Sequence, residues 1–459
     1  LSMKPAFALL FLLFSTLLPW SCRNYSQSDA QQSAARSAPV SFDSGYLKEK
    51  LSYLIKDSLE AQLFAIDSSG ITVYADQRSR EIDSPEFRLF VDEVASVADA
   101  LDHLSGPELI RYYRKKGTKP LPHEARSSIS ELSANPPLHP QAPQPLKGWR
   151  IAVDPGHISG TLALAEIEGK FVKMHPQPLT QQTPIGFWEA NLTLATAYLI
   201  RDQLTRLGAK VIMTRGTPGL SVAGLSYQDW KAKYWPQVVK DSAIAWELTQ
   251  DQLDYWLNKA EEKVIYRSFF NAEDLRNRAE LINGFRPHCT LIIHYNVHGP
   301  NWENRDQENF LPPADTNYLM AFIPGGFLAG ELSKVEERVA LLRLLLTQDW
   351  ENSQRLTKAC LTHSVDKTGV PRVPKENELG YLARSSIYAG ADGLYARNLT
   401  LTRLVESPLV YGESLNQDYL GEAMQLNKRD TVIHGIMAST RLTDVAEAFV
   451  AAVLDYAGE

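Results

Sequence analysis

The chain has 459 residues, of which 44% are hydrophobic and 22% are charged, so it is long enough for two or three domains with a sizeable buried core. Its formal net charge is −7 and its isoelectric point is near 5.9, which gives no sign of the broad basic surface that binds a phosphate backbone. We therefore expect no nucleic-acid partner.

The N-terminal residues have the layout of an export signal. Lys4 precedes an apolar run over residues 6–20, and Ser21 and Cys22 follow directly. Because this run is shorter than the roughly 20 residues that span a bilayer, residues 1–22 predict a signal peptide rather than a membrane helix. The small residue before Cys22 resembles a bacterial lipobox, whose cysteine is lipidated. We expect export to the periplasmic side of the bacterial envelope and a lipid anchor to the membrane at Cys22, with a plain cleaved signal or an uncleaved anchor as alternatives.

The next three segments differ in composition. Residues 23–41 are rich in Ser, Gln, Ala and Asn, which indicates a flexible tether because so few apolar side chains cannot order a chain. Residues 42–116 carry apolar side chains at helical spacing, with one strand expected over residues 70–75, and predict a small, mainly helical accessory module of unknown role. Residues 117–147 are dense in proline, which favours a semi-rigid linker.

From residue 148 onward the sequence alternates between strand and helix patterns. Strands are expected over residues 150–154, 210–214 and 289–294, and helices over residues 191–207 and 275–283. This alternation predicts an α/β catalytic domain over residues 148–459, with a mostly parallel sheet flanked by helices.

Two stretches, near residues 217–270 and 301–375, are too long to be simple connections in that domain. We expect partly helical insertions near the site, with peripheral decoration as the equal alternative. Their length also suggests a lid that limits access to the site.

Three polar residues lie where a parallel sheet places its chemistry, just beyond the carboxyl ends of strands. His157 follows the first strand, Glu189 begins a helix, and His294 ends the third strand. Two imidazoles and a carboxylate are a ligand set for catalytic Zn²⁺, which keeps a fourth position for water or substrate. Such an ion lowers the pKa of its bound water to about 7 and polarises a carbonyl, so an amide is hydrolysed without a nucleophilic side chain.

Five short motifs surround these residues in a fixed order. They are Val-Asp-Pro-Gly-His at 153–157, Trp-Glu-Ala-Asn-Leu at 188–192, Gly-Ala-Lys-Val-Ile-Met-Thr-Arg at 208–215, Asp-Leu-Arg-Asn-Arg at 274–278 and Ile-Ile-His-Tyr-Asn at 292–296. Together they resemble the zinc-dependent N-acetylmuramoyl-L-alanine amidases with a type-3 catalytic domain. The resemblance implies hydrolysis of the amide bond between N-acetylmuramic acid and L-alanine in peptidoglycan, with His157, Glu189 and His294 as zinc ligands. Glu166 and Glu168 are the alternatives to Glu189.

Amide hydrolysis also needs a base that takes the proton of the water and returns it to the leaving amine. The family carries this glutamate near its C-terminus on a strand that ends in Val-Glu, and Thr-Arg-Leu-Val-Glu at 402–406 resembles that strand best. We therefore expect Glu406 to be the catalytic base. Glu413 is its rival, because the residues after Glu406 depart from the family's pattern.

Other polar residues near the motifs have two interpretations each. Asp154 either orients a ligand imidazole or caps the turn after its strand. Arg215 and Arg278 either bind carboxylates of a stem peptide or form ordinary ion pairs, and His298 is expected to be a loop residue.

Several other kinds of chemistry have no support in the sequence. There is no Gly-x-Ser-x-Gly elbow, phosphate loop or dinucleotide fingerprint. Cys289 lies in an apolar strand pattern typical of a buried thiol, and a disulfide with Cys360 is not supported. Two rival functions stay open: a zinc peptidase acting on another peptidoglycan amide, and a non-catalytic envelope lipoprotein that binds peptidoglycan. The identity of any regulatory protein partner is also left open.

Overall fold

The computed structural model describes residues 41–125, 136–175, 184–245, 247–298, 305–375 and 380–458. The predicted signal peptide and all but the last residue of the predicted tether lie outside these ranges. Within them, no helix combines the length and the apolar character needed to cross a membrane.

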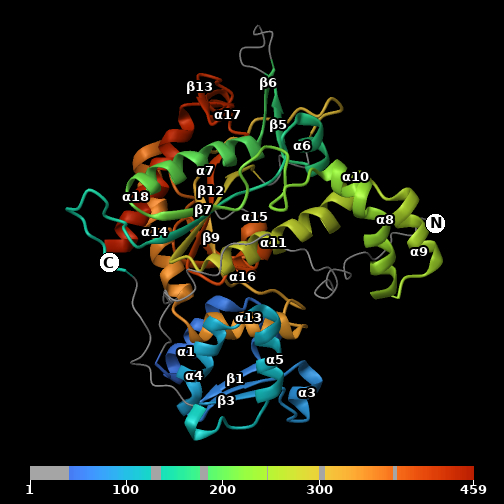
Figure 1. Cartoon of the computed structure of the whole chain (residues 1–459), viewed down its shortest axis with the longest axis vertical. Coiled ribbons are helices and arrows are strands. Elements are labelled where there is room, and N and C mark those ends of the chain that lie inside the picture. The colour runs from blue at the N-terminus through green and yellow to red at the C-terminus, as the bar shows by residue number, and fades with distance from the viewer. Residues whose placement is uncertain are drawn as a thin grey trace.

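A seven-stranded sheet, in the order β10-β11-β9-β12-β8-β4-β7, forms the centre of the larger part of the molecule (Figure 1). Four neighbouring strands run parallel to one another: β12 (Leu409–Asn416), β8 (Cys289–Asn296), β4 (Arg150–Pro155) and β7 (Lys210–Met213). Every residue of β8 is buried, as expected for a central parallel strand with both faces covered. The predicted mostly parallel sheet is confirmed.

Three further strands extend this sheet beyond β12. They are β9 (Met320–Ile323), β11 (Leu394–Ala396) and β10 (Ile387–Ala391). β9 is antiparallel to β12 and parallel to β11, whereas β10 is antiparallel to β11. The expected insertion at 301–375 therefore contributes a strand to the interior of the sheet. Its four residues, Met-Ala-Phe-Ile, are too few to show a strand's periodicity in the sequence.

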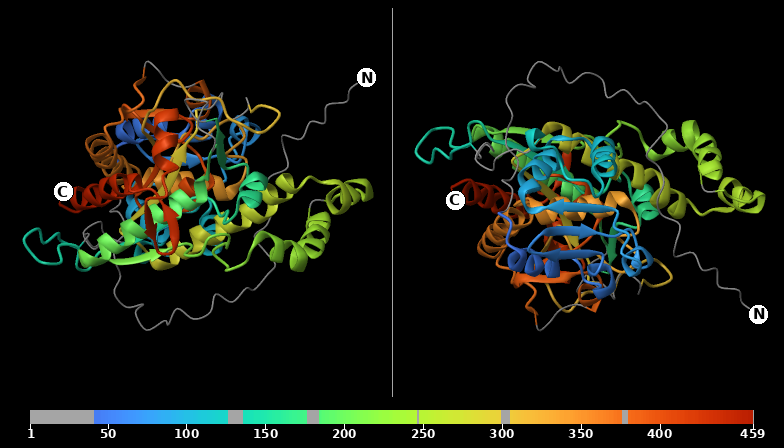
Figure 2. Two further views of the ribbon diagram at one scale, coloured as in Figure 1. Left: turned by 90° about the horizontal axis from the view of Figure 1, so that it is seen from above. Right: turned by 90° about the horizontal axis from the view of Figure 1, so that it is seen from below.

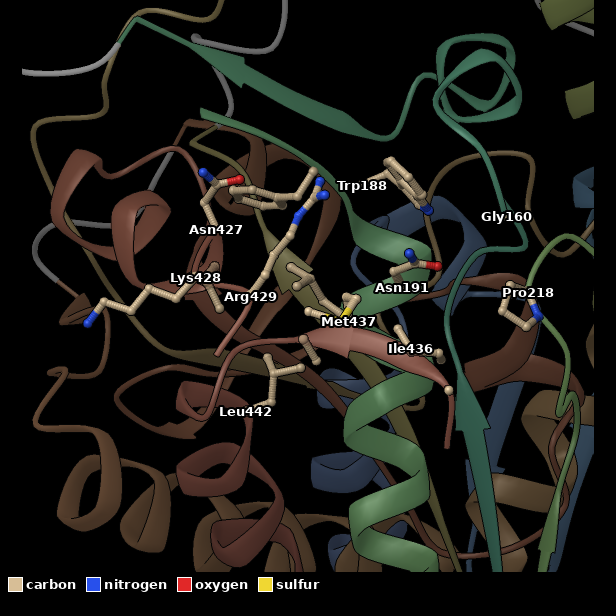
Figure 3. Close-up of a pocket in the computed structure, with 15 residues that line it drawn as sticks. Gly160, Trp188, Asn191, Pro218, Asn427, Lys428, Arg429, Ile436, Met437 and Leu442 are labelled. Carbon is tan, nitrogen blue, oxygen red and sulfur yellow. The ribbon is translucent and has the colours of Figure 1, made fainter. Parts of the chain in front are cut away.

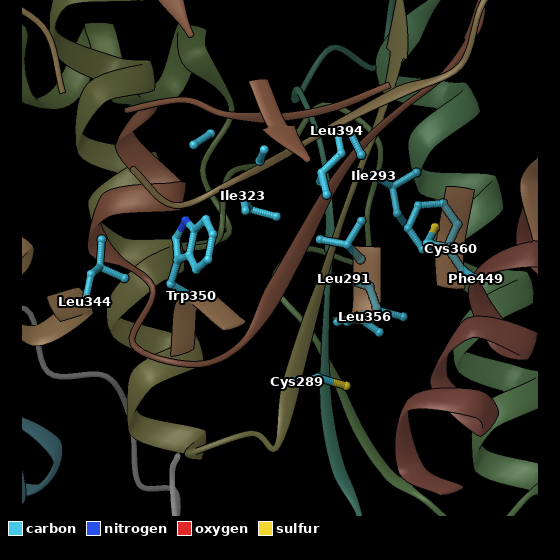
Figure 4. Close-up of a cluster of buried hydrophobic side chains, with 14 of the residues drawn as sticks. Cys289, Leu291, Ile293, Ile323, Leu344, Trp350, Leu356, Cys360, Leu394 and Phe449 are labelled. Carbon is cyan, nitrogen blue, oxygen red and sulfur yellow. The ribbon is translucent and has the colours of Figure 1, made fainter. Parts of the chain in front are cut away.

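Helices cover both faces of the sheet. One face is covered by α7 (Glu189–Arg206), α14 (Asp349–Thr368) and α18 (Arg441–Gly458), and the other by α11 (Asn271–Phe285) and α16 (Thr400–Leu404). Successive strand residues point to opposite faces, so Ile293 joins the first core and Ile292 the second. Figure 4 shows Leu291 and Ile293 of the first core with Phe449 of α18. Both Cys289 and Cys360 are free and buried, as expected.

The accessory module contains more strand than the sequence predicts. Its helices are α1 (Ser44–Leu54), α2 (Ser58–Ala61), α3 (Gln77–Glu81), α4 (Val94–His103) and α5 (Gly106–Lys116). Its antiparallel sheet contains β1 (Phe64–Asp67), β2 (Gly70–Val73) and β3 (Phe87–Phe90), of which only β2 was expected. The module remains mainly helical, and the two missed strands are only four residues long.

The accessory module packs against α13 (Val335–Leu346), a helix from the second expected insertion (Figure 1). Ten of its twelve residues are buried, because it lies between the module and the rest of the chain. Arg338 of α13 forms an ion pair with Glu86 of the module at 2.8 Å. Lys50 of α1 reaches beyond α13 and donates to the Thr347 carbonyl at 2.7 Å. The α13 part of the second stretch is thus a structural bridge, whereas Asn317 of the same stretch lies near the predicted metal site, against Asn416 at the carboxyl end of β12.

The first expected insertion forms a helical arm that extends away from the body (Figures 1 and 2). It includes α8 (Tyr227–Ala245), α9 (Gln250–Asp254) and α10 (Glu262–Ile265), and it leads into α11. Aromatic side chains such as Trp230 and Trp235 form its separate core, which also contains Ile158. Because Ile158 directly follows His157, the arm supports the segment that carries a predicted ligand. Its role as a lid stays a prediction.

Candidate metal centre

His157, Glu189 and His294 converge at the carboxyl ends of β4 and β8, as the sequence analysis expects. Nε2 of His157 lies 3.1 Å from Oε1 of Glu189, and Nδ1 of His294 lies 3.2 Å from each of these two atoms. Among the described residues, these three are the one group of His, Cys, Asp and Glu side chains that could hold a metal ion. The three come from separate parts of the chain, and the parallel strands bring them together.

This triangle of atoms fits a zinc ion. Three ligands at about 2.0–2.1 Å from one tetrahedral Zn²⁺ are separated from one another by about 3.3 Å, close to the separations observed here. Gly156 makes room for the arrangement, because a Cβ at this position would overlap the imidazole ring of His294. Two nitrogens and one carboxylate oxygen are also the donor set of many catalytic zinc sites, which leave a fourth position open.

Glu189 is held in place as an ionised carboxylate. Its Oε1 accepts from the Tyr295 backbone N–H at 3.0 Å, and its Oε2 accepts from Nε2 of Gln417 at 3.1 Å. Burial by itself would raise the pKa of Glu189, but the His157 and Lys170 cations hold that pKa well below its usual range. Gln417 lies beyond the motifs, and no sequence signal pointed to it.

The long gap between His157 and Glu189 has a structural explanation. It contains α6 (Leu162–Glu168) and a two-stranded hairpin of β5 (Phe171–Met174) and β6 (Ile185–Trp188). The second strand of the hairpin ends at Trp188, directly before Glu189 begins α7. Glu189 is therefore the first residue of α7, and the length of the segment between His157 and Glu189 does not change this position.

Glu168 contacts His157 rather than joining the three converging atoms. Its Oε1 lies 3.2 Å from Nδ1 of His157, and its carboxylate accepts from the backbone N–H groups of Ile158 and Ser159 and from the Ser159 hydroxyl. Burial opposes ionisation, yet His157 and these donors lower the pKa of Glu168 to about 2. Metal-bound histidines commonly donate their second N–H to such a carboxylate. Glu168 thus has the orienting role that the sequence analysis considered for Asp154.

Asp154 faces away from the imidazoles. Its carboxylate accepts from the Thr214 hydroxyl and lies 3.3 Å from Nη1 of Arg278, and it is fully buried. Arg215 and Arg278 are also buried, and their side chains donate to backbone carbonyls around His157. Neither arginine is exposed to a stem peptide, so the carboxylate-binding interpretation does not apply to them.

The structure does not bring Glu406 to the candidate centre. The expected strand that ends at Glu406 is wrong, because Thr400–Leu404 forms helix α16 and the strand begins only at Leu409. Glu406 precedes β12 at its amino end, where its backbone N–H donates to Asn283 at 2.9 Å. Glu413 instead pairs in register with His294 on the neighbouring strand. At about 3.3 Å per residue, the four steps from Leu409 to Glu413 alone separate the two ends by about 13 Å. Of the two candidate glutamates, the structure places Glu413 and not Glu406 beside the candidate centre.

The environment of Glu413 differs from that of Glu189. Burial and the negative charge of Glu189 raise the pKa of Glu413 to about 8. Tyr411, on the same strand, stacks on His294 with ring centroids 4.4 Å apart. Burial lowers the pKa of His294 to about 4, so its imidazole is neutral at pH 7 and has a lone pair available for a metal.

His298 lies outside the centre, as expected of a loop residue. Its backbone N–H donates to both carboxylate oxygens of Asp418 at 3.1 Å. This contact joins the segment after β8 to the segment after β12, and His298 is not one of the three converging side chains.

A hollow lies against the helical turn that carries Glu189. Its volume is about 250 Å³. Figure 3 shows around it side chains of α7 and of the hairpin formed by β13 (Thr431–Ile433) and β14 (Ile436–Ala438). The labelled lining residues include Trp188, Asn191, Gly160, Pro218, Arg429 and Met437. His157, Glu189 and His294 do not line this hollow, so it is a separate, partly apolar feature beside the turn that carries Glu189.

The fold and the site together define an α/β protein with a candidate metal centre at the carboxyl edge of its sheet. No protein-family model matches the sequence, and no curated protein matches it. The chain is similar in structure to the N-acetylmuramyl-L-alanine amidase Ami1 from Mycobacterium smegmatis, with 16% identity, a TM-score of 0.36, and coverage of 68% of this chain and 98% of that chain.

Two further amidases give similar values. Ami1 from Mycobacterium abscessus has 18% identity and a TM-score of 0.35, with coverage of 68% of this chain and 99% of that chain. The CwlD amidase from Clostridioides difficile, solved in complex with the GerS lipoprotein, has 13% identity and a TM-score of 0.34, with coverage of 67% and 98%. At such low TM-scores the likeness carries no functional conclusion.

Proposed function

We propose that this chain is a zinc-dependent N-acetylmuramoyl-L-alanine amidase, which hydrolyses the amide bond between N-acetylmuramic acid and the L-alanine of peptidoglycan stem peptides. The observation that carries the proposal is the triangle of Nε2 of His157, Oε1 of Glu189 and Nδ1 of His294, with sides of 3.1–3.2 Å. The five ordered sequence motifs resemble those of that amidase family, and they contain all three residues.

Zn²⁺ at this site would lower the pKa of a bound water and polarise the scissile carbonyl. His157 and His294 would hold the ion through imidazole nitrogens, with His157 giving up its proton on binding, and Glu189 would contribute its negative charge. Glu168 orients the His157 ring through Nδ1.

Glu413 is the residue of this chain that moves the proton. It lies beside His294 in the sheet and is half-buried. Burial and Glu189 raise the pKa of Glu413 to about 8, and a bound Zn²⁺ would favour its ionised form. We infer that this carboxylate would then take a proton from the attacking water and deliver it to the nitrogen of the leaving amine, as general acid–base catalysis requires. The base must come within hydrogen-bond distance of both the water oxygen and the amine nitrogen. A residue next to a metal ligand is close enough to do so.

We also propose that the chain acts at the bacterial envelope, exported by residues 1–22 and held at the membrane by a lipid on Cys22. The apolar run and the small residue before Cys22 support this proposal. A Cys22→Ala variant should leave the membrane fraction or remain unprocessed. Full-length protein in the cytosol would contradict export, and an unchanged distribution of the variant would contradict the lipid alone.

The test of the amidase proposal combines metal and product analysis on the mature protein. We expect about one zinc per chain by elemental analysis, and release of stem peptides with a free L-alanine amino group from purified peptidoglycan by mass spectrometry. His294→Ala is the control and should release none. Cleavage at another amide would indicate the rival zinc peptidase, and peptidoglycan binding without cleavage would indicate the non-catalytic lipoprotein.

A further inference from the structure

Arg215 lies two residues after the end of β7 and is buried beside the candidate centre. Its side chain is nearly inaccessible, with 3% of the residue exposed. Nε donates to the Pro155 carbonyl at 3.0 Å, and Nη2 lies 2.8 Å from the Gly156 carbonyl and 2.9 Å from the Ala190 carbonyl. One guanidinium therefore contacts the segment that carries His157 and the helical turn that carries Glu189.

A second buried arginine holds only one of these segments. Nη1 and Nη2 of Arg278 donate to the carbonyls of Pro155 and His157 at 2.9 and 3.0 Å. Its charge is compensated by Asp274 at 2.6 Å and Asp154 at 3.3 Å. These contacts anchor the His157 segment to α11 and β4, but they do not reach the turn that carries Glu189.

Arg215 differs from Arg278 in its charge balance. Within the described ranges, no carboxylate lies at ion-pair distance from Arg215. Its Nε and Nη2 donate to carbonyls and to the Thr193 hydroxyl, whereas Nη1 has no hydrogen-bond partner among the described residues. Burying a cation without a direct counter-charge costs free energy. Nearby Glu168, Asp154 and Asp274 balance the charge of the two arginines as a group, but none of them is at ion-pair distance from Arg215.

The segment that Arg215 holds is conformationally strained. His157 has a φ of +62°, a left-handed conformation that is uncommon for a residue other than glycine. Such a conformation persists only where the surrounding structure fixes it. Here the carbonyls of Pro155, Gly156 and His157 all accept hydrogen bonds from the two arginines.

We propose that Arg215 is a positioning residue that sets the separation of the His157 and Glu189 ligands. It does so by bridging the carbonyls of Gly156 and Ala190 with one rigid planar group. Thr193 reinforces this bridge, because its hydroxyl donates to the Gly156 carbonyl at 2.6 Å and lies 3.1 Å from Nη2 of Arg215. Lysine cannot reproduce this set of contacts, since one ammonium cannot stand at the positions of both Nε, on the Pro155 carbonyl, and Nη2, on the Gly156 and Ala190 carbonyls. The inference rests on the proposed metal centre.

The test measures metal binding in the absence of peptidoglycan. Arg215→Lys should weaken Zn²⁺ binding by about 10–100-fold, the usual effect of losing a group that orients metal ligands. The measurements are competition with a chelating dye for Zn²⁺ and the visible absorption spectrum of the Co²⁺-loaded protein, whose bands report ligand geometry. Thr193→Val should change the Zn²⁺ affinity and the Co²⁺ spectrum in the same direction as Arg215→Lys, but by a smaller amount. This second variant retains the guanidinium, so it keeps the test valid if Arg215→Lys fails to fold.

Arg343→Lys is the matched control. Arg343 is also 3% exposed, but it pairs with Asp349 and donates to the Val405 carbonyl, before the amino end of β12. Its variant should lose stability to denaturant while its Zn²⁺ affinity stays within about threefold and its Co²⁺ spectrum is unchanged. Wild-type affinity and spectrum in folded Arg215→Lys and Thr193→Val proteins would overturn the inference, as would an equal loss of affinity in the control. Wild-type protein that binds no Zn²⁺ would overturn the proposed function together with the inference, whereas zinc-loaded protein that cleaves no peptidoglycan would overturn only the amidase reaction.

Discussion

The two ends of the central sheet carry the same kinds of residues with different surroundings. At the carboxyl ends of β8 and β12, His294 and Glu413 lie beside one another and face other ionisable groups. Before the amino ends of the same strands, the His288 ring accepts from the Arg150 backbone N–H, and the Glu406 backbone N–H donates to the Asn283 amide oxygen. A histidine and a glutamate near the ends of neighbouring strands are therefore not enough to form a metal site. The end of the sheet at which they lie decides whether ligands from other segments meet them.

The largest expected difference between the two ends is in metal binding. His294→Ala removes one of three zinc ligands, so the protein should lose its zinc, because two remaining ligands no longer form a closed site. His288→Asn, at the other end of β8, should retain about one zinc per chain. Elemental analysis of both purified variants is the measurement. A zinc-loaded His294→Ala protein would show that the ion lies elsewhere.

The two glutamates should differ in catalysis but not in metal content. Glu413→Gln keeps the size of the side chain and removes the proton acceptor, so turnover on peptidoglycan should fall by about two to four decades, or roughly 3–5 kcal/mol of barrier. Glu406→Gln is the matched control and should retain near wild-type turnover. The reverse result, with activity lost in Glu406→Gln and kept in Glu413→Gln, would reject the assignment that the strand register supports.

A smaller effect is expected from the carboxylate that orients His157. Glu168→Gln should weaken Zn²⁺ binding by about 10–100-fold, because the amide is a poorer acceptor for the Nδ1 proton of a bound imidazole. Glu166→Gln is a suitable control, since Glu166 lies on the same short helix and is exposed. Chelator competition gives both affinities. Equal affinities in the two variants would mean that Glu168 only stabilises the turn after His157.

The smallest expected effect lies at the amino end and concerns stability. Burial and the Arg150 cation lower the pKa of His288 from 6.5 to about 4, and its Nδ1 accepts from the Arg150 backbone N–H at 2.8 Å. Because the unfolded chain takes up this proton near pH 6.5 and the folded chain does not, stability is lost as pH falls from about 6.5 to about 4. The full loss is on the order of 3 kcal/mol.

His288→Asn isolates this contribution, because an asparagine oxygen can accept from the same N–H but does not titrate in this range. Denaturant unfolding of the metal-free proteins between pH 8 and pH 4.5 is the measurement. The wild type should lose more stability than the variant over this interval. Parallel curves would show that His288 does not titrate with folding.

The alternation of apolar strands and amphipathic helices was sufficient to predict the α/β class and the parallel strands β4, β7 and β8. It was not sufficient for β1, β3 and β9, because four residues are too few to display a period of two. The role of α13 could not be predicted from the sequence either. Eight of its twelve residues are apolar and four are charged, and such a sequence does not name the two layers between which the helix lies.

The local sequence by itself determined the ends of strands and helices at which His157, Glu189 and His294 occur, because a strand's carboxyl end and a helix's first turn are local features. Only the tertiary structure decided which partners these residues have. The register between β8 and β12 brings Glu413 rather than Glu406 to His294, and the packing of α6 and β7 brings Glu168 and Arg215 to the His157 segment. Register and packing join residues far apart in the sequence, and a single sequence holds no local signal for such pairs.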